Sequence, residues 1–264
     1  MEKHFDFSLV ETYFHISPNG ADQPYYEMPA TAFLLDSGTV KDMLQQSGAT
    51  VQATGLELPA SFVGISLCNL CITQLLFTAQ YNRLLDLTLG NLTFQIEMHD
   101  DHAHLGYKIN ELRSSEVPEA GREAFLARHW KDSFTTIITP AVQAIAAAAG
   151  VKPDMIWQQY GGQLARVRDF VLEHEKREPV LERFHQDCGV LTDLAPELFQ
   201  RKRNPFQHTP RYIDSPYKLG AQLMLHSSCC MYVCRTDGQK CYTCPRMTEA
   251  EREERKARIL AKAQ

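Results

Sequence analysis

Residues 58–82 have the sequence LPASFVGISLCNLCITQLLFTAQYN, which contains no charged side chain. A stretch of this length could cross a bilayer, which takes about 20 apolar residues of helix. It also contains Pro59, Gly64 and Asn69, however, and a helix buried inside a globular protein explains these residues at least as well. We therefore expect a long core helix from about Pro59 to Asn82, and we keep peripheral membrane association as an alternative.

The hydrophobic period changes directly after this helix. Residues 85–89 alternate between apolar and polar side chains and end at Gly90-Asn91, and residues 92–98 and 105–109 follow the same pattern. A period of two residues is typical of half-buried β-strands, and Gly and Asn favour turns. The pattern predicts a small antiparallel meander of three strands.

Helical patterns account for most of the remaining sequence. Pro140 interrupts one helical region, and Pro153 suits the first turn of the next, because proline lacks an amide proton and has a fixed φ. Thr248-Glu249-Ala250-Glu251 is a capping box, and the acids and then bases that follow predict a solvated helix. The expected helical regions are a short helix after Ser37 through Leu44, residues 119–149, residues 153–176, a less regular region at 180–200, and residues 248–264.

Together these patterns predict an α+β fold. We expect a mainly helical body with a small antiparallel sheet over residues 1–220, a cysteine-rich segment at 221–247 and the solvated helix at 248–264. A chain of 264 residues, 44% hydrophobic and 22% charged, is sufficient for a globular core. The net charge of −5 gives no sign of the basic surface that nucleic-acid-binding proteins carry.

The cysteines are unevenly distributed. The N-terminus, Met1-Glu2-Lys3-His4, leads into no apolar run, so we expect no secretory signal and a cytoplasmic location. Cysteines in that compartment are mostly reduced thiols or metal ligands. Five of the eight lie within the 16 residues from Cys229 to Cys244, which indicates a metal site or a redox site there.

The spacing within this segment leaves three interpretations open. Cys241 and Cys244 form a C-x-x-C pair, in which two thiolates can reach one metal. Cys229 and Cys230 are adjacent, and adjacent side chains diverge in an extended chain, so both can serve one site only after a sharp turn or on different metals. Asp237-Gly238 predicts a turn that would bring the pairs together. An iron–sulfur cluster, a structural Zn²⁺ and a redox dithiol remain as candidates.

The order Cys-Cys, ten residues, Cys-x-x-Cys near the C-terminus resembles the FhuF-type siderophore-iron reductases. The motif here consists of Cys229, Cys230, Cys241 and Cys244. A weaker resemblance extends to the helix start at Met155-Ile156-Trp157 and the turn at Asn204-Pro205-Phe206. The resemblance implies that the four cysteines hold a [2Fe–2S] cluster and that the chain is an oxidoreductase acting on metal ions, with no catalytic residue beyond the cluster.

The resemblance also implies the reaction and the partners. The chain is expected to reduce a ferric siderophore, of the hydroxamate type, with electrons from a ferredoxin-like protein or a flavoprotein reductase. A [2Fe–2S] cluster moves one electron, and the reduction of Fe(III) to Fe(II) needs one. The alternative from another class is a zinc-stapled siderophore-binding or scaffold protein without redox activity.

The sequence departs from the family pattern in two places. Leu225-His226-Ser227-Ser228 stands where arginines often precede the double cysteine, which leaves the substrate surface open. Cys234 is an additional thiol, which could substitute as a ligand but which we interpret as a nearby free thiol. The basic stretch that starts at Arg201 is either a solvated loop or a docking patch for an acidic donor or an anionic siderophore. The candidate substrate-binding residues are Arg203, Arg211 and His226.

Other motifs are assigned to structure. The C-x-x-C pair of Cys68 and Cys71 falls in the uncharged helix, where cysteine packs as a small hydrophobic residue. Residues 99–104, with three histidines and two aspartates, have the composition of a metal site but are expected to form a solvated hairpin turn. The chain contains no P-loop and no G-x-G-x-x-G motif, so the sequence indicates no nucleotide or flavin site.

Overall fold

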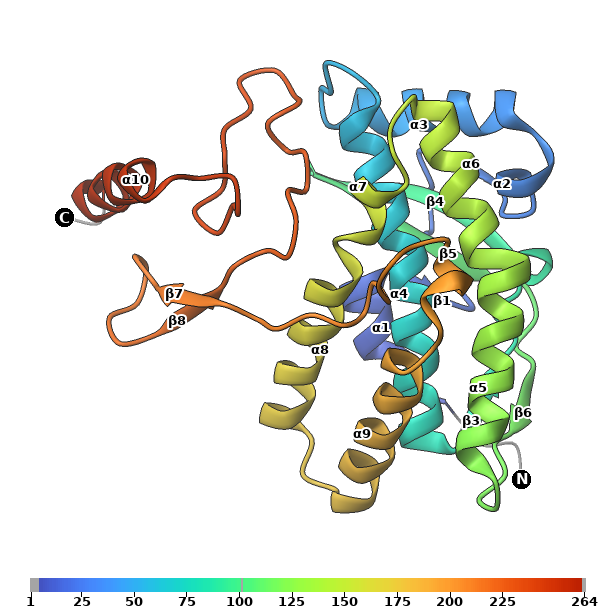
Figure 1. Cartoon of the computed structure of the whole chain (residues 1–264). Coiled ribbons are helices and arrows are strands. Elements are labelled where there is room, and N and C mark those ends of the chain that lie inside the picture. Colours follow the sequence, from blue (N-terminus) through green and yellow to red (C-terminus); the bar gives the residue numbers. More distant parts are fainter. Residues whose placement is uncertain (1–4, 101, 263–264) are drawn as a thin grey trace.

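The computed structural model describes residues 5–100 and 102–262. Helix α4 (Glu57–Tyr81) runs through the middle of the helical body (Figure 1). Of its 25 residues, 20 are buried, so the prediction of a long core helix is confirmed. The helix ends at Asn82, which adopts the left-handed conformation that commonly terminates helices (φ 55°).

By length and composition, α4 is the one continuous helix in the described residues that could cross a membrane. Inside the protein, 89% of its most apolar window is buried, so neighbouring elements cover the apolar side chains. Residues Arg122–Ala149 and Asp154–His174 pass the same test only if they are counted as one span, and they are bent by 117°.

Most of the other helices belong to the helical body around α4, and α10 follows this body in the sequence. The α-helices are α1 (Ser8–Phe14), α2 (Ala32–Leu35), α3 (Ser37–Thr50), α5 (Arg122–Ser133), α6 (Thr139–Ala149), α7 (Asp154–Trp157), α8 (Tyr160–His174), α9 (Glu178–Thr192) and α10 (Glu249–Lys262). Short 3₁₀ helices lie at η1 (Leu89–Asn91) and η3 (Pro196–Phe199), and η2 (Phe134–Ile138) is a π-helix.

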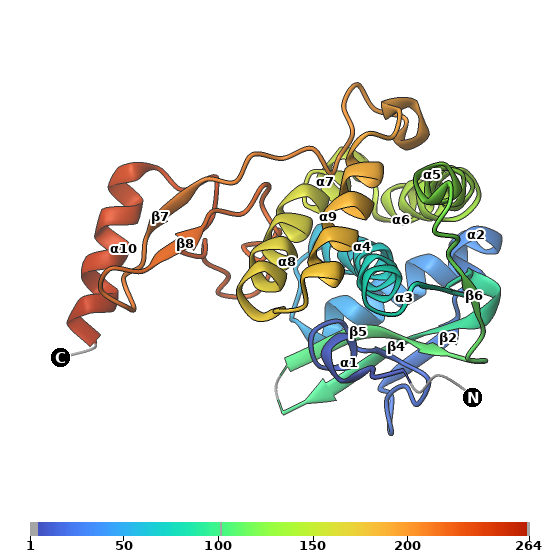
Figure 2. The same ribbon diagram turned by 90° about the horizontal axis from the view of Figure 1, so that it is seen from below.

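A four-stranded sheet covers one side of α3 and α4, and α5, α6 and α9 lie on the other side (Figure 2). Its strand order is β1-β5-β4-β2. Strands β4 (Leu92–His99) and β5 (His102–Ile109) form the predicted hairpin, and β2 (Tyr26–Pro29) pairs antiparallel to β4. Strand β1 (Ile16–Ser17) is parallel to β5. The α+β class is therefore confirmed.

The predicted three-stranded meander is wrong in its first strand. Strand β3 (Arg83–Leu85) pairs with β6 (Ser114–Glu116) in a separate two-stranded sheet, away from β4 and β5. The Asp86 carboxylate accepts hydrogen bonds from the hydroxyl (2.7 Å) and the amide (3.3 Å) of Thr88. Such local bonds bend the chain and compete with strand pairing. The alternating pattern of residues 85–89 therefore does not continue as a strand.

Two predicted helices are interrupted. Helix α5 continues through the π-helical turn η2 into α6, and Pro140 lies in the first turn of α6. A proline inside a helix has no amide proton to donate and its ring crowds the preceding turn, which favours such an interruption. The helix expected at 153–176 consists of α7 and α8, which are separated at Gln158 and Gln159. The cause of this second break is a contact with the cysteine-rich segment.

The C-terminal part of the chain lies to one side of the helical body. Figures 1 and 2 show α10 and the hairpin of β7 (Tyr212–Asp214) and β8 (Gln222–Met224) projecting beyond α7 and α8. The capping box is confirmed. The Thr248 amide donates to the Glu251 carboxylate at 2.7 Å, and the Glu251 amide donates to the Thr248 hydroxyl at 3.3 Å.

Candidate metal centre

The four cysteines predicted as ligands line one small cavity. Its other lining residues include His226 and Lys240, whereas Cys234 is not among them. Two of the four thiols, on Cys229 and Cys244, belong to buried residues, and Cys230 and Cys241 are partly exposed. The structure therefore brings the two cysteine pairs together near the surface.

The four thiols are hydrogen-bonded in two pairs. Cys230 bonds to Cys241, which lowers the pKa of the Cys241 thiol to about 4 and raises that of Cys230. Burial raises the pKa of Cys244, and a hydrogen bond with Cys229 acts in the same direction. Each pair therefore combines one cysteine of the Cys-Cys motif with one of the C-x-x-C motif.

The backbone turns sharply after the adjacent cysteines. Met231 has a positive φ of 62°, and the Cys234 amide donates to the Met231 carbonyl at 2.8 Å. The predicted turn at Asp237-Gly238 is present, with Asp237 at φ 55°. A Cβ atom on Gly238 would lie 2.6 Å from the Val233 carbonyl oxygen, so only glycine fits this close approach. These turns let both members of the Cys-Cys motif face one cavity.

A buried serine of the core helix holds the Cys-Cys motif. The Ser61 hydroxyl donates to the Cys230 carbonyl oxygen at 2.9 Å and accepts a 2.9 Å hydrogen bond from the Gln159 amide group. Both Ser61 and Gln159 are buried. Buried polar groups need partners, so this network fixes the position of Cys230 against the first turns of α4.

Ser227 holds the chain just before the cysteines. Its hydroxyl donates to the Gln158 carbonyl oxygen at 2.7 Å and accepts from the Gly162 amide at 3.2 Å. In a continuous helix these two backbone groups, four residues apart, would bond to each other. Insertion of a side chain into such a bond breaks the helix, which explains why α7 and α8 are separate.

The loop between the cysteine pairs is fixed by backbone hydrogen bonds. The Thr54 amide donates to the Cys234 carbonyl at 3.0 Å, and the Thr236 amide donates to the Gln52 carbonyl at 2.9 Å. Gln52 and Thr54 connect α3 to α4. The Cys234 region therefore docks on the helical body, and burial raises the pKa of the Cys234 thiol.

The C-x-x-C motif is held by β7 and α10. The Tyr242 hydroxyl donates to the Asp214 carbonyl at 3.0 Å. The Arg252 guanidinium donates to the carbonyl oxygens of Tyr242, Cys244 and Met247. Helix α10 was expected to be solvated and no more, and its first turns are in fact bonded to the cysteine segment.

Of the three candidate substrate-binding residues, His226 alone lines the cavity. Arg203 and Arg211 are exposed and are not among the lining residues. Arg201, which begins the basic stretch, forms an ion pair with Asp154 of α7 at 2.7 Å. Its charge is therefore partly neutralised.

His226 has a further partner that sequence reasoning missed. Nη1 of Arg166 on α8 lies 3.1 Å from Nδ1 of His226, and Nη2 donates to the Gln163 side-chain oxygen at 2.9 Å. His226 also hydrogen-bonds the Cys241 thiol. Arg166 precedes the cysteine segment by sixty residues in sequence, so no local pattern links the two.

The four cysteines supply the number of thiolates that an iron–sulfur cluster or a structural zinc ion requires. Among the described residues, no group of three or more His, Cys, Asp or Glu side chains stands in an arrangement that could hold a metal ion. A tetrahedral Zn²⁺ needs all four sulfurs at about 2.3 Å from one point. Thiols arranged in two pairs around one cavity suit a group with two metal positions better than a single ion.

The other cysteines lie elsewhere. Cys68 and Cys71 are buried in α4, and burial raises the pKa of both thiols, that of Cys71 to about 12. Both are neutral core residues, as expected. Cys188 is buried in α9, and burial likewise raises its pKa to about 12.

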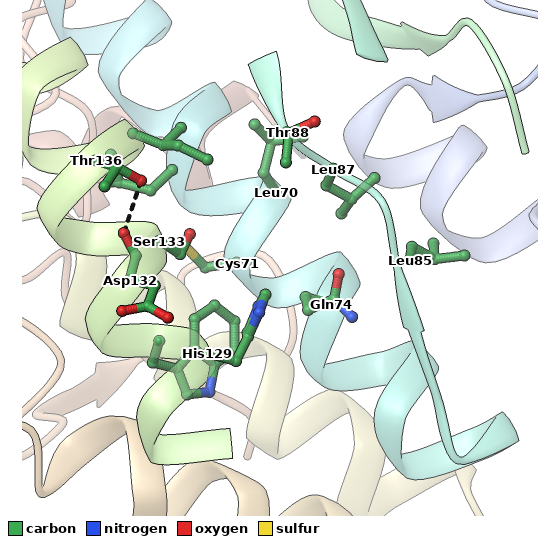
Figure 3. Close-up of a pocket in the computed structure, with 13 residues that line it drawn as sticks. Leu70, Cys71, Gln74, Leu85, Leu87, Thr88, His129, Asp132, Ser133 and Thr136 are labelled. Carbon is green, nitrogen blue, oxygen red and sulfur yellow. Dashed lines mark hydrogen bonds between the residues drawn. The ribbon is translucent and has the colours of Figure 1, made fainter. Parts of the chain in front are cut away.

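A second cavity lies between α4, α5 and the segment that follows β3 (Figure 3). Cys71, His129 and Gln74 line it together with leucines, and it includes none of the predicted ligands. Of the histidine-rich residues 99–104, residue 101 lies outside the described residues. His99 pairs with His102 at the end of the β4–β5 ladder, and the His99 side chain is 57% exposed. The His104 ring packs against the His15 ring at an interplanar angle of 48°, with centroids 4.2 Å apart.

No protein-family model matches this chain, and no curated protein sequence matches it.

Proposed function

We propose that the chain is a FhuF-type ferric-siderophore reductase that holds a [2Fe–2S] cluster on Cys229, Cys230, Cys241 and Cys244. The observation that carries the proposal is the convergence of these four thiols, and not of Cys234, on one cavity near the surface. When bound, the cluster would supply one electron at a time, which is the number that Fe(III) needs.

The residues of this chain would hold and tune that group. Ser61, Ser227 and Arg252 fix the backbone around the cysteines through hydrogen bonds. The Thr243 hydroxyl lies 3.7 Å from the Cys241 sulfur, and His226 bonds the same sulfur. Hydrogen bonds to ligand sulfurs and partial exposure are the levers by which a protein sets the potential of an iron–sulfur group.

The reaction balances as a one-electron transfer. The electron leaves the reduced protein and enters the ferric ion of the siderophore, giving Fe(II), which hard oxygen ligands hold far more weakly. The donor that restores the reduced protein is proposed to be a ferredoxin-like protein or a flavoprotein reductase of the cytoplasm. The electron transfer itself requires no general acid or base, because no covalent bond within the siderophore is broken. The Fe–O coordination bonds open after the reduction, and protonation of the freed oxygen ligands by the solvent assists the release.

The experiment has two stages. Purified protein is examined for colour, iron and acid-labile sulfide, and then the anaerobically reduced protein is mixed with a ferric hydroxamate in the presence of a ferrous chelator. We expect a reddish-brown protein whose visible absorption changes on reduction, and rapid reoxidation with release of Fe(II). Trapping of Fe(II) draws the reaction forward by mass action. A colourless protein that contains zinc would support the scaffold alternative instead, and a coloured protein that no siderophore class reoxidises would refute the reductase assignment.

A further inference from the structure

Arg166 places a cation beside the cysteine site without a carboxylate partner. Its guanidinium bonds to His226 and to the neutral amide of Gln163. Among the described residues, no ion pair joins Arg166 to an aspartate or glutamate. Burial lowers the pKa of Arg166, and the neighbouring thiols of Cys68 and Cys230 would act in the opposite direction if they were ionised. An arginine nevertheless stays protonated in proteins, so a partly buried positive charge lies here.

A buried charge without a partner is costly, so its retention calls for a compensating negative charge. Within the described part of the chain, the thiols that act on Arg166 are those of Cys68, a neutral core residue, and Cys230, so the cysteine site is the source of negative charge that we consider. Four thiolates contribute four negative charges, and one-electron reduction of the group they hold adds another. A nearby fixed cation is therefore attracted more strongly to the reduced state than to the oxidised state.

The path from Arg166 to the ligands is defined by hydrogen bonds. Because Arg166 donates to Nδ1 of His226, that nitrogen carries no proton, and Nε2–H is the donor that the ring retains. His226 bonds the Cys241 thiol, and Cys241 bonds Cys230. The guanidinium therefore orients the imidazole and acts on the Cys230–Cys241 pair rather than on the Cys229–Cys244 pair.

We propose that Arg166 is a positioning residue that, through His226, serves as the counter-charge of the Cys230–Cys241 side of the site and raises the reduction potential of the group bound there. This inference rests on the proposed function, because it concerns the potential of the bound [2Fe–2S] cluster. It adds to that function a residue of the helical body that lies outside the cysteine motif.

The test is the midpoint potential of the purified, iron-loaded protein, measured by spectroelectrochemical titration. Arg166→Gln should make the one-electron reduction less favourable by at least about tenfold, a shift of about 59 mV to more negative potential. Arg166→Lys keeps the charge and should retain most of the wild-type potential. Arg168 lies on the same helix and is exposed, so Arg168→Gln is the matched control and should leave the potential unchanged.

A second variant protects the test against misfolding of Arg166→Gln. Gln163→Glu keeps nearly the same shape and gives Arg166 the carboxylate partner that it lacks, so it should also move the potential in the negative direction. The Asn69 amide, which now accepts from Gln163, can rotate and donate to the new carboxylate. Far-UV circular dichroism and iron content establish that each variant is folded and loaded.

The outcomes separate the two claims. A folded, loaded Gln163→Glu protein with the wild-type potential overturns the role of Arg166 and leaves the reductase proposal intact. Equal shifts in Arg166→Gln and Arg168→Gln would also overturn it, because a general surface effect would then be responsible. A wild-type protein that contains zinc and no iron overturns the proposed function, and the role of Arg166 with it.

Discussion

The Ser227 hydroxyl lies 3.2 Å from the Gly162 amide nitrogen and takes the place of a helical hydrogen bond. The same hydroxyl donates to the Gln158 carbonyl, which would otherwise accept from that amide. The same contact of Ser227 thus separates α7 from α8 and anchors the cysteine segment to the helical body. The approach is possible because residue 162 has no side chain.

Gly162→Ala should loosen the cysteine segment while leaving the helical body folded. A Cβ atom at this position would lie 2.5 Å from the Ser227 hydroxyl oxygen, so the serine must move. Overpacking of this kind costs roughly 1–3 kcal/mol. We expect iron to be lost to a chelator severalfold faster than from the wild type, measured by the decay of visible absorption, with little change in far-UV circular dichroism.

Gly189 provides the control for this substitution. It lies in α9, and a Cβ atom there would meet nothing within 4 Å. Gly189→Ala should leave iron retention unchanged and stabilise the helix by up to about 1 kcal/mol. If both variants retain iron as the wild type does, the Ser227 contact does not support the site.

The second prediction concerns ligand identity. Serine substitution of any cysteine that lines the cavity should abolish or strongly reduce iron and acid-labile sulfide per chain. The cysteines concerned are Cys229, Cys230, Cys241 and Cys244. A hydroxyl is a poorer ligand than a thiolate for iron–sulfur groups.

The remaining four cysteines are the internal controls. Cys234→Ser should retain the full content, because Cys234 does not line the cavity. Serine at Cys68, Cys71 or Cys188 is expected to act on stability and not on iron stoichiometry, because these cysteines are buried in α4 and α9. Loss of iron after Cys234→Ser alone, or its full retention after Cys230→Ser, would contradict the assignment.

The parts of the structure that could be predicted from the sequence are those determined by local patterns. The uncharged run gave the limits of α4 to within two residues, and the capping box at Thr248 marked the start of α10. The Asp237-Gly238 turn is equally local, since it depends on a left-handed residue followed by a glycine. In each case neighbouring residues supply the physical cause.

The parts that could not be predicted depend on contacts between distant residues. The break at Gln158 is caused by Ser227, 69 residues later, and Arg166 contacts His226, 60 residues later. Strand β1 pairs with β5 although some ninety residues separate them, and its two residues carry no strand pattern of their own. The pattern of neighbouring residues in a short stretch of sequence does not indicate which distant residues will be in contact.

The third prediction is a pH dependence of stability that arises from His129. Burial lowers the pKa of this histidine to about 4 in the folded protein, where it lines the cavity of Figure 3. The ordinary value in an unfolded chain is about 6.5. Between these values the unfolded chain binds more protons, so the stability contribution is complete above pH 6.5 and is lost as the pH falls towards 4.

His129→Gln should remove this dependence. At about 1.4 kcal/mol per pKa unit, the loss in the wild type amounts to roughly 2–3 kcal/mol between pH 7 and pH 4. Urea unfolding at several pH values should show a smaller decline for the variant. His185 is exposed on α9, so His185→Gln should follow the wild-type curve. Identical slopes for all three proteins would refute the assignment to His129.

The last prediction concerns Arg252 and the role of α10. This arginine donates to three carbonyl oxygens around the C-x-x-C motif, two of which belong to Tyr242 and Cys244. Without the guanidinium the Cys244 oxygen keeps the Met247 amide as a donor at 3.2 Å, but all three oxygens lose their charged partner. A lost hydrogen bond to a charged group costs about 1.5–3 kcal/mol. Arg252→Ala should therefore accelerate iron loss to a chelator. Arg252→Lys should retain iron better than Arg252→Ala but less well than the wild type, because a single ammonium group cannot span all three oxygens.

Arg258 on the same helix separates this effect from a general effect on α10. It pairs with Glu254 one turn earlier, and both side chains are largely exposed. Arg258→Ala should cost at most about 0.5 kcal/mol of helix stability and leave iron retention unchanged. Equal acceleration in both variants would mean that α10 supports the site through its folding rather than through Arg252. Wild-type iron retention in Arg252→Ala would instead mean that the cysteine segment holds its shape without the hydrogen bonds of Arg252.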